Sequence, residues 1–114
     1  EMPSFVATWT ADYNDPDNFI YTFFGSEENV VNRSLNYKDT DVINRVAAAR
    51  AIIDDEERMA EYAALEEKIV KDDAAWVPLF SRSHFYVLGD RVESFTPHWA
   101  GYSAYIYSTF KLAD

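Results

Sequence analysis

The sequence contains no cysteine, which excludes disulfide bonds, thiolate zinc sites and cysteine nucleophiles within the chain. Only three glycines occur among 114 residues, and none of them builds a glycine-rich phosphate loop. No apolar run approaches the roughly 20 residues that a membrane-spanning helix needs. Basic residues number 10 against 20 acidic ones. The resulting net charge of -10 would repel a phosphate backbone, so no nucleic-acid partner is expected.

The residues that are present indicate a folded chain of mixed α+β class. Hydrophobic residues make up 48% of the sequence and aromatic residues 17%, unlike the composition of disordered chains. Pro16 suits a first helical turn and predicts a short helix over 17–25 that ends at Gly25. The polar residues 26–37 are expected to form a loop. Runs rich in strand formers predict strands at 4–9, 77–92 and 104–112.

Two amphipathic helices are the clearest part of the pattern. The first is expected to begin at Asp39 or Thr40 and the second at Asp54 or Asp55, because these residues suit helix N-caps. The short connection between the helices predicts an antiparallel hairpin. The apolar residues expected to face the core are Val42, Val46, Ala49 and Ile53 in the first helix and Met59, Tyr62, Leu65 and Ile69 in the second.

The opposite face of the second helix is charged, and it has two interpretations. We interpret it as a solvated face, with an acidic partner-binding surface as the alternative. The residues on this face are Glu61, Glu66, Glu67, Lys68 and Lys71.

Residues 9–19, WTADYNDPDNF, crowd acids and amides between aromatic side chains. An EF-hand calcium loop starting at Asp12 fails, because Pro16 falls at its fifth position and Phe23 at its twelfth. His84 and His98 lack the spacing of a zinc motif, and no Gly-x-Ser-x-Gly elbow occurs. The sequence therefore predicts no metal, no cofactor and no enzyme activity.

Asp12 follows Trp9 by three residues, and local chemistry leaves two interpretations of it open. Asp12 could be a turn-forming residue beside a core tryptophan. It could instead be a fixed acceptor for an ammonium group, with Trp9 as an apolar wall, since a carboxylate and an ammonium make a strong charge-assisted contact.

Four blocks in order resemble the oligopeptide, dipeptide and nickel-binding family of extracytoplasmic solute-binding proteins that feed ABC importers. The blocks are 9–19, Asn36-Tyr37, 54–80 and Gly89 near VESF. The resemblance implies the C-terminal portion of a two-lobed, type II periplasmic-binding-protein fold, with a helix hairpin packed on strands. Residues 1–83 would belong to the second ligand-binding lobe, and 84–114 would return to the first lobe. The remaining segments of the parent protein would supply the facing wall of the cleft.

The resemblance also implies a function, namely peptide capture for uptake. Asp12 would hold the N-terminal ammonium and Trp9 would line the cleft. The expected ligand-binding residues are Trp9, Thr10, Ala11, Asp12 and Asn14. The partners would be a peptide or other amine-bearing solute and a membrane permease. The location would be the periplasm, or the outer face of the bacterial membrane through a lipid anchor.

Two departures from the family pattern leave the ligand open. Thr8 stands where many relatives have glycine, and Val6 stands where some have a basic residue that could take a peptide carboxylate. Capture of a carboxylate, and with it peptide length, is therefore not predicted. A non-peptide solute is one alternative, because the same fold serves several ligands. A stand-alone interaction domain that uses the acidic helix hairpin is the other.

Overall fold

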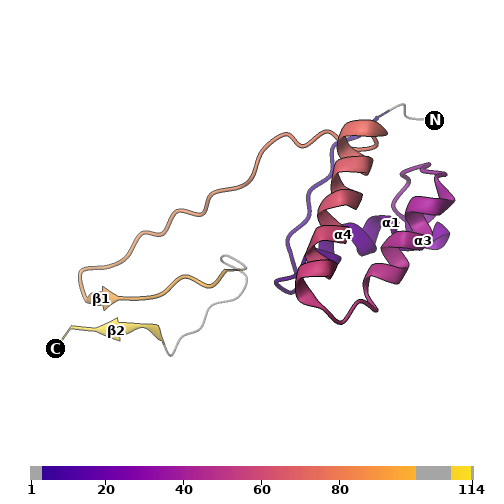
Figure 1. Cartoon of the computed structure of the whole chain (residues 1–114). Helices are drawn as coiled ribbons and strands as arrows, with labels where there is room; N and C mark the ends of the chain where they lie inside the picture. Colours follow the sequence, from indigo (N-terminus) through magenta and orange to yellow (C-terminus); the bar gives the residue numbers. More distant parts are fainter. Residues whose placement is uncertain (1–3, 100–108, 114) are drawn as a thin grey trace.

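The computed structural model describes residues 4–99 and 109–113 of the chain. The helices gather into one body, and the following residues leave it as an extended arm that carries a small two-stranded sheet (Figure 1). The radius of gyration is 18.4 Å for 114 residues, whereas a compact chain of this length has about 13 Å. The expected mixture of helices and strands is confirmed, and among the described residues the buried core lies in the helical body.

The helical body contains four α-helices and a π-helical turn that continues the last of them. These elements are α1 (Asp17–Phe24), α2 (Glu27–Asn32), α3 (Thr40–Ala49), α4 (Asp55–Glu67) and η1 (Lys68–Asp72).

Helix α1 begins and ends where the sequence predicts. Pro16 occupies the N-cap position, and the Asp15 carboxylate accepts a hydrogen bond from the backbone N–H of Asp17 at 2.8 Å. Gly25 closes the helix by donating its N–H to the Tyr21 carbonyl at 2.9 Å. This arrangement places the acidic residues of 9–19 directly before the helix.

Helices α3 and α4 form the expected hairpin. Asp39 caps α3 by accepting the N–H of Val42 at 3.1 Å, and Asp54 caps α4 by accepting the N–H of Glu57 at 2.9 Å. The expectation that Ile53 faces the core is wrong: Ile53 is 96% exposed, because α3 ends at Ala49 and Ile53 lies in the connection.

The hairpin packs on α1, which corrects the expectation that it packs on strands. Phe24 of α1 is fully buried between the two helices, with Val46 from α3 and Leu65 and Ile69 from α4 and η1. Aromatic side chains of α1, rather than a sheet, pack against the apolar face of the hairpin. Met59 was also expected in this core, but it is 44% exposed.

Residues 27–32 form helix α2, so the expectation of a loop over 26–37 is wrong there. Ser26 caps the helix by accepting the N–H of Asn29 at 3.0 Å. The helix ends in a Schellman turn, in which Ser34 has a φ of 58° and the Leu35 N–H donates to the Val30 carbonyl at 3.0 Å. The signal for this helix was a serine followed by two acids, which suits a helix start.

The strand predictions hold only in part. Strand β1 (Val92–Ser94) pairs antiparallel with β2 (Lys111–Leu112), and Val92 lies opposite Leu112. Residues 104–108 of the last predicted strand lie outside the described residues. The segments 4–9 and 77–89 are extended but form no strand, because none of the described segments pairs with them. Residues 90–91 form the turn before β1, in which the Val92 N–H donates to the Gly89 carbonyl at 2.9 Å.

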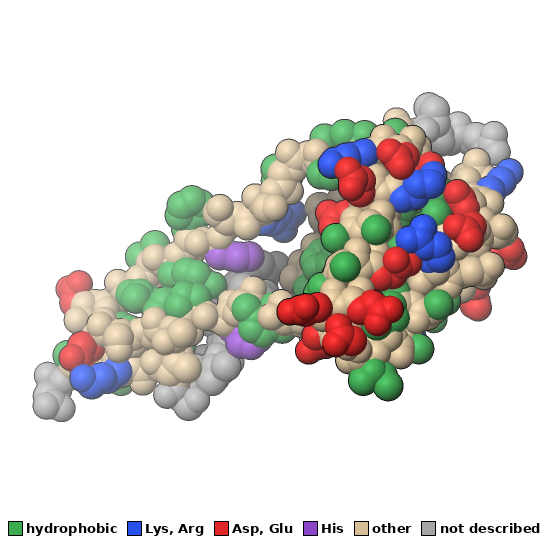
Figure 2. Space-filling view, in the orientation of Figure 1, with side chains coloured by type: hydrophobic (Ala, Val, Ile, Leu, Met, Phe, Trp, Pro, Cys, Tyr) green, Lys and Arg blue, Asp and Glu red, His purple; other side chains and the backbone are tan. Residues whose placement is uncertain are grey.

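The arm exposes a series of large apolar side chains (Figure 2). Val87 is 99% exposed and Phe85 is 92% exposed. Exposed apolar side chains in such number are typical of surfaces that contact another molecule. The other exposed apolar residues of the arm are Val77, Leu79, Phe80 and Leu88.

Candidate ligand-binding site

A buried amide, Asn18, joins the two residues on which the sequence analysis centred. Its Oδ1 atom accepts a hydrogen bond from the indole Nε1 of Trp9 at 2.8 Å and from the backbone N–H of Asp12 at 3.1 Å. Asn18 lies in the first turn of α1 and is only 2% exposed. Because one atom fixes both partners, the relative position of the Trp9 ring and the Asp12 backbone is set by α1.

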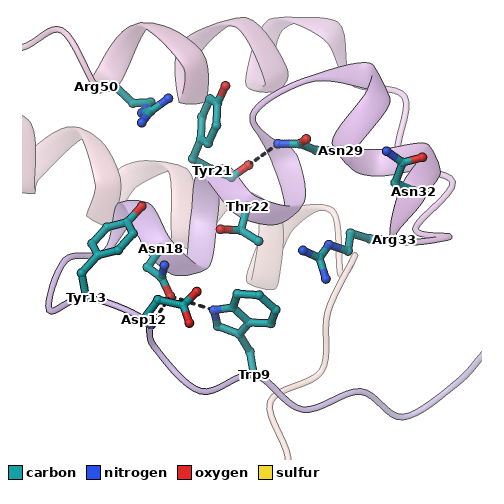
Figure 3. A pocket seen from close by; sticks show the side chains of 10 residues that line it. All are labelled: Trp9, Asp12, Tyr13, Asn18, Tyr21, Thr22, Asn29, Asn32, Arg33 and Arg50. Atoms are coloured by element: carbon teal, nitrogen blue, oxygen red, sulfur yellow. Dashed lines mark hydrogen bonds between the residues drawn. The ribbon is translucent and has the colours of Figure 1, made fainter. Parts of the chain in front are cut away.

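Trp9 and Asp12 lie at the edge of a cavity of about 530 Å³ (Figure 3). The cavity walls come from the loop before α1, from α1 itself, from α2 and from the end of α3. Most of the side chains that line it are polar or aromatic, which suits a ligand with several hydrogen-bonding groups. The lining residues are Trp9, Asp12, Tyr13, Asn18, Tyr21, Thr22, Asn29, Asn32, Arg33 and Arg50.

The Asp12 carboxylate is the acid of this cavity. The Asp12 side chain is exposed, and within the described part of the chain it forms no ion pair. The hydrogen bond to Asn18 uses the backbone of Asp12 and leaves both carboxylate oxygens available. Asp12 can therefore accept hydrogen bonds from a cationic group that enters the cavity.

A second acid, Asp17, anchors the loop to the helical hairpin. Asp17 is buried, with 5% of the residue exposed, and its carboxylate accepts hydrogen bonds from the hydroxyls of Tyr13 at 2.5 Å and Tyr62 at 3.0 Å. The Arg50 Nε atom lies 3.1 Å from the same carboxylate, and the attraction raises the pKa of Arg50. Burial raises the pKa of Tyr62, and the hydrogen bond to Asp17 raises it further. Asp17 is thus a structural acid whose charge is already satisfied.

Asp15 supplies a second link between the loop and the hairpin. The Arg58 Nη2 atom of α4 lies 2.5 Å from Asp15 Oδ1. The guanidinium of Arg58 holds the pKa of the Asp15 carboxyl below its ordinary value. Asp15 and Asp17 are therefore already paired within the protein. Among the three acids of residues 9–19, Asp12 remains the candidate for binding a ligand.

The five residues expected to bind ligand do not share one cavity. Trp9 and Asp12 line the cavity described above, whereas Ala11 and Asn14 line a second one of about 560 Å³, with Phe19, Met59 and Trp99 among its other walls. Thr10 is exposed and lines neither of the two.

Several cavity residues were not found from sequence. Asn18, Arg33 and Arg50 belong to three different elements, and only packing brings them together. The turn after α2 places Arg33 over the Trp9 ring, with its guanidinium carbon 4.9 Å from the ring centroid. The sequence carries a signal for the helix start at Ser26, but none for the cavity.

Residues 4–99 and 109–113 contain neither a candidate metal site nor a helix that could span a membrane. No three or more His, Cys, Asp or Glu side chains in these ranges are arranged to hold a metal ion. No helix there has the length and apolar character required to cross a membrane.

Comparison with curated proteins yields three relatives, all with names of binding proteins. The chain is 32% identical over 92 residues to the "Probable D,D-dipeptide-binding periplasmic protein DdpA" of Escherichia coli, covering 79% of this chain and 17% of that protein. It is 27% identical to heme-binding protein A of Haemophilus influenzae, covering 92% and 19%. It is 32% identical to the periplasmic oligopeptide-binding protein OppA of Salmonella typhimurium, covering 65% and 13%.

These matches define the class of protein as an extracytoplasmic solute-binding protein. The chain belongs to the oligopeptide, dipeptide and nickel-binding family of these proteins, and is extracytoplasmic by that membership. It spans less than a fifth of the length of each of the three relatives, at 17%, 19% and 13%. No family model and no solved structure matches the chain.

Proposed function

We propose that the chain is part of the substrate-binding component of an ABC importer, and that this component captures peptides for uptake. Asp12 holds the N-terminal ammonium of the peptide, and Trp9 forms an apolar wall beside it. The relatives named for dipeptides and oligopeptides support the ligand class. Thr10, Ala11 and Asn14 lie outside the Asp12 cavity and would contact other parts of the peptide in the complete site.

The observation that carries the proposal is the shared anchor of Trp9 and Asp12 on Asn18. A binding carboxylate gains affinity when it is held in place before the ligand arrives, because less ordering is needed on binding. The 3.1 Å hydrogen bond from the Asp12 backbone to Asn18 supplies that order, while the carboxylate itself stays free of ion pairs within the described residues.

The complete site is proposed to lie between two lobes of a larger protein that close on the ligand. Residues 1–83 form part of the second lobe, and residues 84–114 return to the first lobe. The extended arm supports this arrangement, because its exposed apolar residues, such as Phe85 and Val87, need other protein surface to cover them. The permease of the importer is the proposed membrane partner.

Calorimetric titration of the intact parent protein tests the proposal. The titrant is one peptide mixture, used first with free N-termini and then after N-acetylation. We expect heat of binding with the free form and at least tenfold weaker binding after acetylation, since a charge-assisted contact is lost. Equal binding of both forms would show that Asp12 is a turn residue. Binding of neither form would favour a non-peptide solute, as the relative named for heme illustrates.

A second candidate, the interaction domain that uses the acidic face of α4, has less support in the structure. Glu61 already forms an ion pair with Arg45 at 2.9 Å, and Glu67 forms one with Lys71 at 2.8 Å. Glu66 is the better probe, because within the described residues it forms no ion pair. Charge reversal at Glu66 is expected to leave ligand binding unchanged.

A further inference from the structure

We infer that Arg33 is a specificity-determining residue of the candidate site, and that it selects ligands that carry a carboxylate near the amine bound at Asp12. The inference rests on the proposed function, since it concerns a second group of the same ligand. It narrows the substrate class from amine-bearing solutes to dipolar ones, which present a positive and a negative group to the same cavity.

The position of Arg33 is fixed by its neighbours. Arg33 is the C-cap residue of α2, and its N–H donates to the Asn29 carbonyl at 3.0 Å. Its guanidinium carbon lies 4.9 Å from the Trp9 ring centroid and 5.2 Å from that of Phe23. Figure 3 shows the side chain directed from α2 toward Trp9, at the cavity. These cation–π contacts hold the guanidinium, and because it forms no ion pair with any described residue, its N–H groups can bind a planar carboxylate.

The charged side chains of the cavity differ in whether another residue of the protein already pairs with them. Three charged side chains line it: Asp12, Arg33 and Arg50. Arg50 is occupied, because it forms an ion pair with Asp17 at 3.1 Å and stacks on Tyr21 at 4.1 Å. Arg33 forms no ion pair with any described residue. One free acceptor and one free guanidinium therefore face the same space.

Arg33 also answers a question that the sequence left open. Val6 stands where some relatives have a basic residue, so the sequence predicts no partner for a ligand carboxylate. Arg33 reaches the Trp9 ring from a different element, 24 positions further along the chain. A basic side chain is thus absent at position 6 before Trp9, but the Arg33 guanidinium lies over the Trp9 ring in the folded chain.

The carboxylate could come from either of two parts of a peptide. It could be the C-terminal carboxylate of a dipeptide, or an acidic side chain close to the N-terminus of a longer peptide. Both present the same planar anion to Arg33, and amidation distinguishes them, because it neutralises the C-terminus and leaves a side chain unchanged.

The test is a set of calorimetric titrations of the intact parent protein with two pairs of peptides. One pair is dialanine and dialanine amide. The other pair is two tripeptide amides that differ in glutamate or glutamine at the second position. We expect the wild-type protein to prefer the acidic member of at least one pair by about tenfold or more, as for a charge-assisted contact. Whichever pair shows the preference identifies the source of the carboxylate.

Two variants assign the preference to Arg33. Arg33→Gln is expected to reduce it to less than threefold while leaving affinity for the neutral members nearly unchanged. Lys71→Gln removes the same charge from η1, where Lys71 contacts Glu67 at the end of α4, and is expected to keep the preference. If Arg33→Gln folds poorly, Arg33→Lys serves instead, since an ammonium keeps the charge but loses the bidentate geometry.

The outcomes separate this inference from the proposed function. Equal binding of acidic and neutral members by the wild-type protein, with free-amine peptides still preferred over acetylated ones, would overturn the role of Arg33 alone. An equal loss of affinity for both members in Arg33→Gln would also overturn it. Equal binding of free and acetylated peptides, or no binding of any, would overturn the proposed function and the inference with it.

Discussion

The indole N–H of Trp9 donates a 2.8 Å hydrogen bond to the side-chain oxygen of Asn18, nine residues further along the chain. The same oxygen accepts the backbone N–H of Asp12. Helix α1 therefore positions the loop that carries the candidate acid. The rigidity of this loop does not depend on the ligand, because all three groups belong to the protein.

Asn18→Leu is expected to weaken both the fold and the site. The substitution keeps a similar volume but leaves the Trp9 and Asp12 N–H groups without their acceptor, which costs about 1–3 kcal/mol of unfolding free energy. The affinity for free-amine peptides is expected to fall more than the affinity for N-acetylated ones. Urea unfolding and calorimetry measure the two effects. Asn44→Leu, on the exposed face of α3, is the control and should change neither.

Asp12→Asn is expected to abolish the preference for free-amine peptides and to leave stability within about 0.5 kcal/mol, since exposed substitutions away from special features have small effects. The reason is that the Asp12 carboxylate forms no ion pair with the described residues, so its charge is not needed by the fold. Competition titration with free and acetylated peptides measures the preference. An unchanged preference in Asp12→Asn would contradict the ammonium subsite, and Asp55→Asn at the start of α4 is the matched control.

Gly25→Ala is expected to destabilise the protein by about 1–3 kcal/mol, the range for overpacking. Gly25 has a φ of -79°, so backbone freedom does not explain it. An added Cβ would lie only 2.1 Å from the Tyr21 ring, and the ring cannot move without leaving its 4.1 Å contact with Arg50. Thermal unfolding of the variant measures the effect. Restored stability in the double variant Gly25→Ala, Tyr21→Ala would confirm that the ring is the cause.

Ser34→Gly is expected to stabilise the protein by up to about 1 kcal/mol. Ser34 has a φ of 58° in the turn that ends α2, a conformation in which glycine carries no steric penalty. The matched control is Ala47→Gly inside α3, where the introduced glycine is expected to lower the free energy of unfolding by about 1 kcal/mol. Denaturant unfolding of both variants gives the comparison. Destabilisation by Ser34→Gly would show that the serine side chain has a role of its own.

Asp15→Asn is expected to reduce the loss of stability in acid. In the folded protein the Arg58 guanidinium lowers the pKa of the Asp15 carboxyl below its ordinary value of 3.8. A carboxyl whose pKa is lowered by folding contributes stability that is fully present above the unfolded-state pKa. This contribution disappears as the pH falls through the folded-state pKa. The asparagine keeps an acceptor for the Asp17 N–H but cannot pair with Arg58, so it should cost about 1–3 kcal/mol at neutral pH. Unfolding curves from pH 7 down to about pH 2 test this, and parallel curves for both proteins would contradict it.

Part of the arrangement of the acidic loop follows from the sequence. Trp9 and Asp12 do meet at one cavity, but the residue that joins them, Asn18, could not be recognised among several acids and amides in the same stretch. Its role depends on which of these side chains α1 turns toward the preceding loop, and that direction follows from how α1 packs on the hairpin. Arg33 was missed for a related reason, because residues 27–32 were expected to be a loop.

The sequence by itself determined the helices α1, α3 and α4, because a cap and an apolar stripe depend on residues three or four positions apart. Asp39 and Asp54 begin their helices where the pattern predicts. Only the tertiary structure decided the rest. The segment 77–89 has the composition of a strand and forms none, since a strand needs a partner to satisfy its hydrogen bonds and no described segment pairs with it. The cavity beside Trp9 likewise forms only where the loop before α1, α1, α2 and the end of α3 pack together, and no local sequence pattern predicts that packing.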